Sequence, residues 1–260
     1  MIKLAGIGAS RGIAIGKIYL LDRSRMCVLK YEIQKDEINK EIQRFKEAVA
    51  ESTKYLNKIK EKAKKNLDSK FLGIMNGHMM ILQDDLLVSE TIDRIKNERI
   101  NAEWVFQKSM KRLRNIFLKM DDEYLRERGK DIDHVGNLIL RNLIGHDQES
   151  IADLNEKAII VSRDLAPSDV VQMKKDKVLG FVTEAGGKTS HVSIMAASFE
   201  IPAVVGLNDI IEKAGLGDSI IVDGIEGVVI INPTKEEFKH YLKKLQIFRI
   251  PQQRTTENKR

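Results

Sequence analysis

The pattern of apolar and polar positions divides the chain into three stretches. In residues 1–22, β-branched residues on both sides of Gly16 predict a strand near the N-terminus. In residues 32–145, apolar residues recur at helical spacing and no proline occurs. Each helix there has one apolar face to bury, so this stretch predicts an all-helical bundle.

Three helices of the bundle stand out in this pattern. A continuous apolar stripe over residues 38–63 predicts one long helix, and residues 104–120 outline a later one. The Asp-Asp pair at 121–122 can cap a further helix, which would begin near Glu123. Gly145 can end that helix, because glycine readily adopts the left-handed conformation that follows a helix.

The third stretch, residues 151–232, has short apolar runs separated by Gly, Pro and Asp, a pattern typical of alternating strands and helices. A hairpin is expected to turn around residues 224–227, and a last helix is expected to run to about Leu245. We expect the N-terminal strand to pair with this third stretch, so that the helical stretch is an insertion.

The predicted fold class is therefore mixed, α+β or α/β, with three parts. The first is an α/β subdomain of residues 1–22 plus 146–235, and the second is the inserted helical subdomain of residues 32–145. Residues 236–260 form the third part, a C-terminal helix with a polar tail.

Composition and charge narrow the function classes. The 260 residues include 44 Lys and Arg against 38 Asp and Glu, a net charge of +6 that is interleaved with acids along the chain. This favours a solvated surface over nucleic-acid binding, and no basic recognition helix is visible. No apolar run approaches the roughly 20 residues of a membrane helix. Because the N-terminus lacks a secretory pattern and Cys27 is the only cysteine, we expect a cytoplasmic protein without a disulfide.

Two glycine-containing segments resemble nucleotide-binding loops but lack the required context. Residues 6–13 resemble a dinucleotide-binding turn, yet the helical stretch follows where a βαβ unit is needed. Residues 187–189 resemble the end of a phosphate-binding loop, but Val182 stands where that loop needs a glycine. The five histidines show no paired spacing typical of metal ligands, so no metal site is expected.

The segment after the predicted strand that ends near Thr183 carries the strongest candidate chemistry. Two adjacent glycines predict a turn with positive φ, where a ligand can approach the backbone closely. Thr189 or Ser190 can cap the helix that follows. His191 then falls in the first helical turn, after Gly186, Gly187, Lys188, Thr189 and Ser190.

A histidine in this position can accept a phosphoryl group. The helix N-terminus presents unpaired N–H groups and partial positive charge, which suit a phosphoryl group. The same charge disfavours the imidazolium form and leaves a neutral ring nitrogen free to attack. His191 is therefore the predicted covalent acceptor, supported by the charge of Lys188 and by nearby hydroxyls. From the residues alone, a polar histidine without a chemical role is an equally good interpretation.

The motif Gly-Gly-Lys-Thr-Ser-His-Val-Ser-Ile-Met-Ala at 186–196, followed by Glu-Ile-Pro-Ala-Val-Val-Gly at 200–206, resembles the phosphohistidine signature of the phosphoenolpyruvate-utilising enzymes. The opening residues 8–17 are similar to that family as well, with Arg11 in place of its usual proline. Further segments resemble helices of the N-terminal domain of enzyme I of the bacterial phosphoenolpyruvate:sugar phosphotransferase system; they lie at 77–85, 121–128 and 140–145.

The resemblance implies that His191 is phosphorylated on Nε2 and that the helical subdomain docks HPr, the small histidine phosphocarrier protein. In the family, the phosphoryl group comes from phosphoenolpyruvate bound to a C-terminal barrel that uses Mg²⁺ and dimerises the enzyme. Such a barrel needs about 250 residues, far more than the residues that follow the α/β stretch. We therefore expect a monomer that holds no cofactor, does not use phosphoenolpyruvate and exchanges phosphoryl groups with phospho-HPr.

Further roles follow from the same resemblance. Arg128 is expected either as a charge partner at the phosphoryl site or in an ion pair with Glu127 or Asp131. Val170 stands where the family has a threonine that hydrogen-bonds the active-site imidazole, which a valine cannot do. The Met and Leu residues of the expected docking patch fit ordinary helix core equally well. The patch for HPr consists of His78, Met79, Met80, Leu82, Asp84 and Leu86.

Two alternatives to this phosphotransferase module stay open. A catalytically silent protein-binding or regulatory module on the same scaffold is consistent with Val170 and with the missing barrel. The swivelling domain of a pyruvate phosphate dikinase or phosphoenolpyruvate synthase belongs to the same class, but the helical insertion argues against it.

Overall fold

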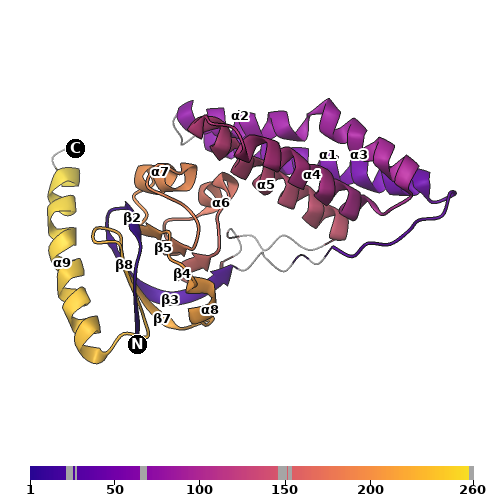
Figure 1. Ribbon diagram of the computed structural model, residues 1–260. Helices are drawn as coiled ribbons and strands as arrows, with labels where there is room; N and C mark the ends of the chain where they lie inside the picture. Colours follow the sequence, from indigo (N-terminus) through magenta and orange to yellow (C-terminus); the bar gives the residue numbers. More distant parts are fainter. Residues whose placement is uncertain (22–25, 27, 65–68, 146–150, 152–153, 258–260) are drawn as a thin grey trace. The chain divides into compact units, whose positions relative to one another are not determined.

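The computed structural model divides the chain into two compact units (Figure 1). The α/β unit comprises Met1–Arg25 and Glu149–Arg260, and the helical unit comprises Met26–Gln148. The structure describes all residues except 22–25, 27, 65–68, 146–150, 152–153 and 258–260.

Strands from both ends of the chain form one sheet in the α/β unit. In the described residues the strands are β1 (Ile2–Ala5), β2 (Ile7–Ser10), β3 (Ile13–Leu21), β4 (Ala158–Ser162), β5 (Val178–Thr183), β6 (Ala203–Val205), β7 (Ser219–Asp223) and β8 (Val228–Ile231). The helices are α6 (Pro167–Gln172), α7 (His191–Ser198), α8 (Ile210–Lys213) and α9 (Lys235–Glu257). The expected pairing of the N-terminal strand with the third stretch is confirmed, because β3 lies between β4 and β7.

The sheet has the order β1-β8-β7-β3-β4-β5-β6-β2. Neighbours from β3 to β6 are parallel, whereas the outer pairs are antiparallel. The two edge strands β1 and β2 are separated in sequence by Gly6 alone, so the sheet must curl until its edges approach each other. Gly6 N donates a 2.8 Å hydrogen bond to Gly227 O in the turn between β7 and β8. The hairpin expected around residues 224–227 is confirmed by the pairing of these two strands.

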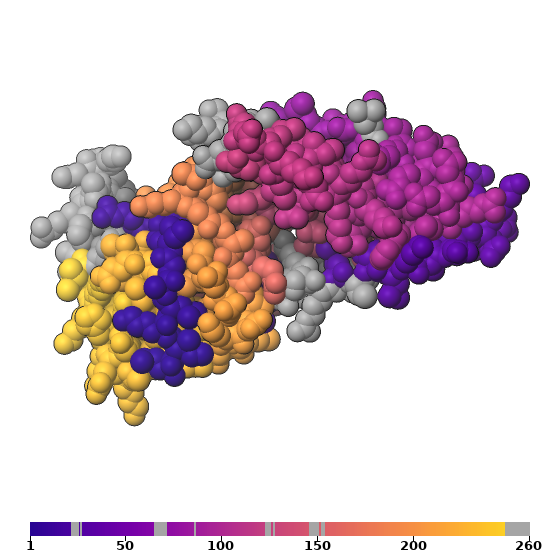
Figure 2. All heavy atoms as spheres, in the orientation of Figure 1, coloured from indigo at the N-terminus to yellow at the C-terminus, as the bar shows by residue number. Residues whose placement is uncertain are grey.

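The curled sheet has apolar residues on both faces. Ile221 and Ile230 pack with Tyr241 of α9, so this helix covers the outer face of β7 and β8. In contrast, β1 is mostly exposed, and its indigo atoms lie on the surface of this unit in Figure 2. Alternate strand residues point into the main core, whose members include Ile18, Ile159, Val161, Val182, Val204, Ile220, Val222, Val229 and Ile231.

The C-terminal helix is longer than the sequence pattern indicates. α9 extends to Glu257, so the expected end near Leu245 is wrong. Beyond Leu245 the helix continues through the apolar residues Ile247, Phe248 and Ile250 and through Pro251. The apolar pattern therefore did not require the helix to end at Leu245.

The helical unit is built from one-sided helices that pack against each other. α1 packs against α2 and α5, and α4 packs against α3 and α5. Gly145 follows the last helix with a φ of +74°, as expected for a glycine that ends a helix. No helix within the described residues is both long and apolar enough to span a membrane. The described helices are α1 (Ile38–Lys64), α2 (Ser69–Leu82), α3 (Asp85–Glu98), α4 (Ala102–Leu118) and α5 (Glu123–Ile144), which confirms the three that the pattern predicts.

Candidate functional site

A turn between β5 and α7 positions His191. β5 ends at Thr183, and α7 begins with His191 itself. Gly186 has a φ of +110°, and a Cβ built on it would lie 3.3 Å from Val205 Cβ, so glycine suits this position in both conformation and space. Gly187 lacks a positive φ, and a Cβ built on it would meet nothing within 4 Å. The predicted turn with positive φ is therefore present, and Gly186 is the glycine that adopts it.

Ser190 is the N-cap of α7. Its φ of −62° and ψ of 150° are extended, and its Oγ accepts a 3.3 Å hydrogen bond from Ser193 N. Its own backbone N–H donates to Gly187 O at 3.1 Å and closes the turn. Of the two caps that the sequence allowed, the structure selects Ser190, while Thr189 is exposed.

Ser193 holds the same turn from inside the helix, a role that the sequence pattern did not predict. Its side chain is buried, lies 2.9 Å from Ser190 Oγ and donates a 2.7 Å hydrogen bond to Gly187 O. The spacing of two serines three residues apart, as in a capping box, is the sequence signal that points to it. The Gly-Gly segment and the first turn of α7 are thus one hydrogen-bonded structure.

α7 is fixed to the sheet beneath it. Val192, Met195 and Ala196 are buried, as their spacing predicted. Ser10 Oγ of β2 donates a 3.2 Å hydrogen bond to Ala196 O. The helix also packs against α6 and β6. The start of α7 therefore has a defined position within the α/β unit.

His191 itself is half-buried at the first position of this helix. The imidazole is therefore not sealed inside the core. Complete burial would have excluded the transfer of a group to a docking protein. The positive end of the helix dipole lies at this terminus, and the exposed Lys188 adds charge three residues earlier. Val170 is fully buried in α6, the helix that packs against α7, and contributes no hydroxyl there.

The carboxyl end of β4 adds a basic residue beside the turn. Ala185 N donates to Arg163 O at 2.9 Å, so the segment after β4 runs next to the segment after β5. Arg163 Nε lies 3.6 Å from Glu184 Oε2, and Glu184 Oε1 accepts a 3.1 Å hydrogen bond from Ile211 N. Glu184 thereby holds Arg163 at the sheet edge from which the His191 turn starts. The parallel pairing of β4 and β5, which places the two segments together, is not encoded in local spacing.

Arg128 lies in α5 of the helical unit. Its Nη1 is 3.6 Å from Asp131 Oδ2, so the ion pair with Asp131, one of the two expectations for this residue, is present. Gly77 leaves space for the guanidinium, since a Cβ built there would clash with Arg128 Nη1. The side chain of Glu127, the other expected partner, lies outside the described residues. A role of Arg128 at the phosphoryl group stays a prediction.

The expected docking patch divides into buried and exposed residues. His78, Met79 and Leu82 are buried, with exposed fractions of 2%, 8% and 1%. They lie in the core of the helical unit, which for Met79 and Leu82 is the helix-core interpretation. A contact of these three residues with a docked protein stays a prediction. Met80 is 74% exposed. Asp84 is also exposed and caps α3, accepting a 3.0 Å hydrogen bond from Leu87 N.

The sixth residue of the patch, Leu86, lies in α3, but its side chain is outside the described residues. The burial of His78, Met79 and Leu82 has a simple cause. Residues 78, 79 and 82 lie on one face of α2 at helical spacing, and that face packs against α1 and α5. Met80 lies on the opposite face of the same helix.

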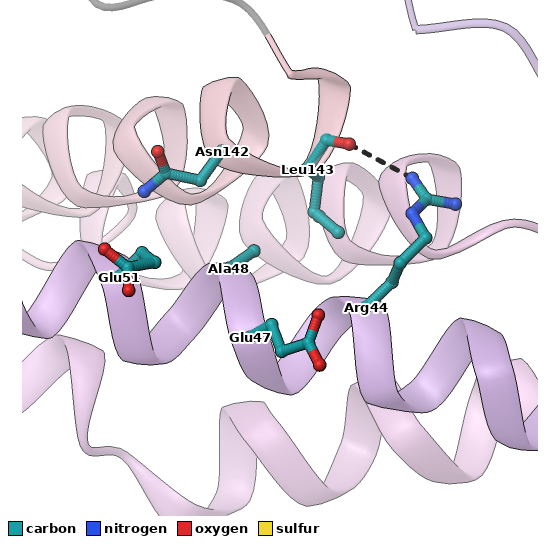
Figure 3. Close-up of a pocket in the computed structure, with 6 residues that line it drawn as sticks. All are labelled: Arg44, Glu47, Ala48, Glu51, Asn142 and Leu143. Carbon is teal, nitrogen blue, oxygen red and sulfur yellow. Dashed lines mark hydrogen bonds between the residues drawn. The ribbon is translucent and has the colours of Figure 1, made fainter.

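A pocket of about 190 Å³ opens between α1 and α5 (Figure 3). Arg44 donates a 3.1 Å hydrogen bond to Leu143 O there and also pairs with Glu41 and Glu103. Burial opposes the charge of Arg44, but the two carboxylates outweigh it and raise the pKa of the guanidinium above its usual value. Because Arg44 is engaged by these groups, the pocket is better explained by helix packing than by anion binding. Its lining consists of Arg44, Glu47, Ala48, Glu51, Asn142 and Leu143.

The sequence matches two descriptions of one family. Residues 5–128 match "PEP-utilising enzyme, N-terminal", and residues 154–227 match "PEP-utilising enzyme, mobile domain". The phosphoenolpyruvate-protein phosphotransferase of Listeria monocytogenes serovar 1/2a is 41% identical, over 93% of this chain and 42% of its own. That of Bacillus subtilis strain 168 is also 41% identical, over 94% of this chain and 42% of its own.

Solved structures match over almost the whole chain. A solution NMR structure of an enzyme I protein is 39% identical, with a TM-score of 0.77, and the match covers 95% of this chain and 99% of that one. The N-terminal domain of an enzyme I described as nitrogen-type shares the fold at 20% identity and a TM-score of 0.62, over 94% of this chain and 99% of its own. The predicted mixed fold class is confirmed by these matches.

The two family matches together cover most of the chain, which therefore belongs to the family described as PEP-utilising enzymes. Within that class, the chain belongs to the enzyme I family, the phosphoenolpyruvate-protein phosphotransferases, and corresponds to their N-terminal part. The resemblance given by the sequence motifs is confirmed, and enzyme I is preferred to a dikinase. The chain spans 42% of the length of the curated relatives named above.

Proposed function

We propose that this chain carries a phosphoryl group on His191 and exchanges it with the active-site histidine of HPr. The observation that carries the proposal is the position of His191. The ring is half-buried at the first residue of α7, on a turn that Gly186 and Ser190 hold in place. A ring in that position can be reached by a docked protein while its backbone stays fixed.

The proposed step exchanges one N–P bond for another. Nε2 of the neutral His191 ring attacks the phosphorus of N-phosphohistidine on HPr. The N–P bond of HPr breaks as the new bond forms, and its electron pair returns to the HPr imidazole. Each phosphorylated ring carries a proton on the nitrogen opposite the phosphorus, so the total number of protons on the two rings does not change.

Positioning and electrostatics are the contributions that we assign to this chain. The N–H groups at the start of α7 and the charge of Lys188 would stabilise the oxygens of the transferring group. The rigid turn would keep the ring aligned for in-line attack. These effects act on a group of high negative charge, where fixed positive dipoles are most effective.

The partner surface in this proposal includes Met80 and Asp84. An exposed methionine offers an adaptable apolar contact, and an exposed carboxylate suits a basic face of HPr. We assign the use of phosphoenolpyruvate and Mg²⁺ to the part of the relatives that this chain does not match. On its own, the chain would then exchange phosphoryl groups only with phospho-HPr.

The test is transfer from HPr that carries a ³²P label. We expect label on the wild-type chain that is stable in base and labile in acid, as for a phosphohistidine, and none on His191→Ala. His240→Ala is the matched control, because His240 is an exposed histidine of α9. An unlabelled wild-type chain, or equal labelling of His191→Ala, would contradict the proposal.

The alternative of a silent module is favoured by one observation, the buried Val170 in place of a hydroxyl residue. We propose that the absence of a hydroxyl at position 170 loosens the His191 ring without abolishing transfer, since the turn and the Ser190 cap remain. Wild type and Val170→Thr should then both accept the label, with rates that differ by less than about tenfold, or about 1.4 kcal/mol. Transfer by Val170→Thr together with none by wild type would support the silent module instead.

A further inference from the structure

Three potential metal ligands meet inside the helical unit, on helices that do not form the His191 turn. His78 comes from α2, and Asp131 and His134 come from α5. One ligand atom of each lies within 4.8 Å of the others. His78 and Asp131 are each 2% exposed, and His134 is half-buried. The sequence spacing gave no sign of this group, because its members come from two separate helices.

The geometry of the group is close to that of a coordination shell. His78 Nε2 lies 3.2 Å from Asp131 Oδ1, and the rings of His78 and His134 meet edge to face with centroids 6.3 Å apart. Ligands at about 2.0–2.2 Å from a tetrahedral metal lie about 3.3 Å from each other. The first pair already has this separation. His134 follows Asp131 by three residues on the same helix face and needs only a small side-chain movement to join them.

We propose that His78, Asp131 and His134 bind a first-row divalent cation, of which Zn²⁺ is the best fit. Two imidazoles and one carboxylate suit Zn²⁺ or Co²⁺, whereas Mg²⁺ and Ca²⁺ prefer oxygen ligands. Three protein ligands leave a fourth position for water, and the half-buried His134 marks the side from which the ion enters. The pairing of α2 with α5 preorganises the site.

The positive charge of Arg128 should lower the affinity of this site for a metal ion. Arg128 Nη1 lies 3.6 Å from Asp131 Oδ2, so the guanidinium and the metal ion share one carboxylate. The two cations repel each other, which weakens metal binding. Removing the guanidinium should therefore tighten binding, an outcome that is not expected if the metal binds elsewhere on the chain.

The experiment is a titration of the full, chelator-treated chain with Co²⁺ and Zn²⁺. We expect one equivalent of Co²⁺ to give visible absorption bands of a tetrahedral nitrogen and oxygen site, and Zn²⁺ to displace it. His134→Ala should weaken binding by at least about tenfold, as even the loss of an outer-shell partner does. His240→Ala and His191→Ala should change the affinity less than about twofold, as expected of histidines outside the metal shell.

A second variant keeps the test decisive if His134→Ala folds poorly. Arg128→Ala should bind Zn²⁺ at least about threefold more tightly than wild type, from the relief of one repulsion across several ångströms of solvated protein. Absence of Co²⁺ bands, unchanged affinity in both variants, or a loss in His191→Ala equal to that in His134→Ala would overturn the site. None of these readouts depends on phosphoryl transfer, so the site and the proposed function stand or fall separately.

Discussion

The two units hold their polar groups by different means. Around His191, the α/β unit uses backbone turns and hydrogen bonds between residues close in sequence, such as that from Ser193 Oγ to Gly187 O. In the helical unit, Ala102 N donates a 2.7 Å hydrogen bond to Glu41 Oε1 from a helix far away in the sequence. Buried polar groups must be paired in either case, but only the first kind of pairing is written in local sequence.

The start of α4 illustrates the second kind of pairing. Asn101 stands at the N-cap but forms no capping hydrogen bond with its side chain. Instead Glu41 of α1 accepts from Ala102 N and also pairs with Arg44. The carboxylate thus caps one helix from another and contributes to their packing. The helical unit caps α4 with a side chain from another helix, whereas the α/β unit caps α7 with Ser190, the residue directly before it.

The largest effect is therefore expected from Glu41→Ala. The substitution removes a buried carboxylate that accepts from one backbone N–H and one guanidinium, and we expect it to lower the free energy of unfolding of the helical unit by about 3 kcal/mol. Trp104 lies in α4 and is the only tryptophan of the chain, so its fluorescence during urea unfolding reports on this unit.

Glu47→Ala is the matched control, because Glu47 is exposed on the same helix. It should change the free energy of unfolding by less than about 0.5 kcal/mol. If both variants unfold at the same urea concentration as wild type, the helical unit does not depend on its long-range pairs, and the contrast between the units disappears.

The same contrast explains what the sequence could predict. The strand ending at Thr183, the turn at Gly186 and a cap before His191 are local signals, and each has its counterpart in the structure. The burial of His78 could not be predicted in this way. Its partner Asp131 is 53 residues away, and helical spacing shows which residues share a face but not which helix covers it.

The curled sheet was predictable from the sequence only in part. Its strands from β3 to β8 were predictable from short apolar runs, but the two edge strands β1 and β2 and the strand order were not. The closure depends on Gly6, which joins the two edge strands, and no propensity marks a glycine as the junction of two sheet edges. The position of Arg163 beside the His191 turn follows from that strand order and so was equally hidden.

Gly186 and Gly187 test how far the turn before His191 depends on backbone conformation. Gly186→Ala should destabilise the turn by about 2 kcal/mol, because alanine must adopt positive φ and its Cβ meets Val205 at 3.3 Å. Gly187→Ala should stay within about 0.5 kcal/mol, since its Cβ would enter open space. Hydrogen exchange of the α7 amides measures both. Equal effects of the two substitutions would show that the turn does not depend on the backbone at Gly186.

A smaller effect is expected from the cap of α7. Ser190→Ala removes the acceptor of Ser193 N and should cost about 1 kcal/mol, seen as faster exchange of the Ser193 amide. Thr189→Ala is the control and should leave this exchange unchanged, because Thr189 is exposed and is not the cap. Equal exchange rates in the two variants would assign the cap to some other group.

The smallest effect concerns a long-range ion pair of the α/β unit. Lys244 of α9 lies 2.7 Å from Asp223 Oδ2 and 2.6 Å from Glu226 Oε1. Burial disfavours the charged ammonium, but the bonds to the two carboxylates outweigh it and raise the pKa of Lys244. The pair should contribute about 0.5 kcal/mol, in line with partly exposed ion pairs. Lys244→Met should lower the free energy of unfolding by that amount.

The pH dependence of this loss tests its cause. A group whose pKa is raised on folding stabilises the protein fully below its unfolded pKa of about 10.4, and the contribution disappears as the pH rises through the folded pKa. The difference between Lys244→Met and wild type should therefore be constant from about pH 7 to 9 and shrink above about pH 10.5. Lys243→Met, at an exposed neighbouring position, corrects for Tyr241, whose pKa burial also raises. A difference that stays constant at high pH would show that α9 is held by its apolar contacts with β7 and β8 and not by this ion pair.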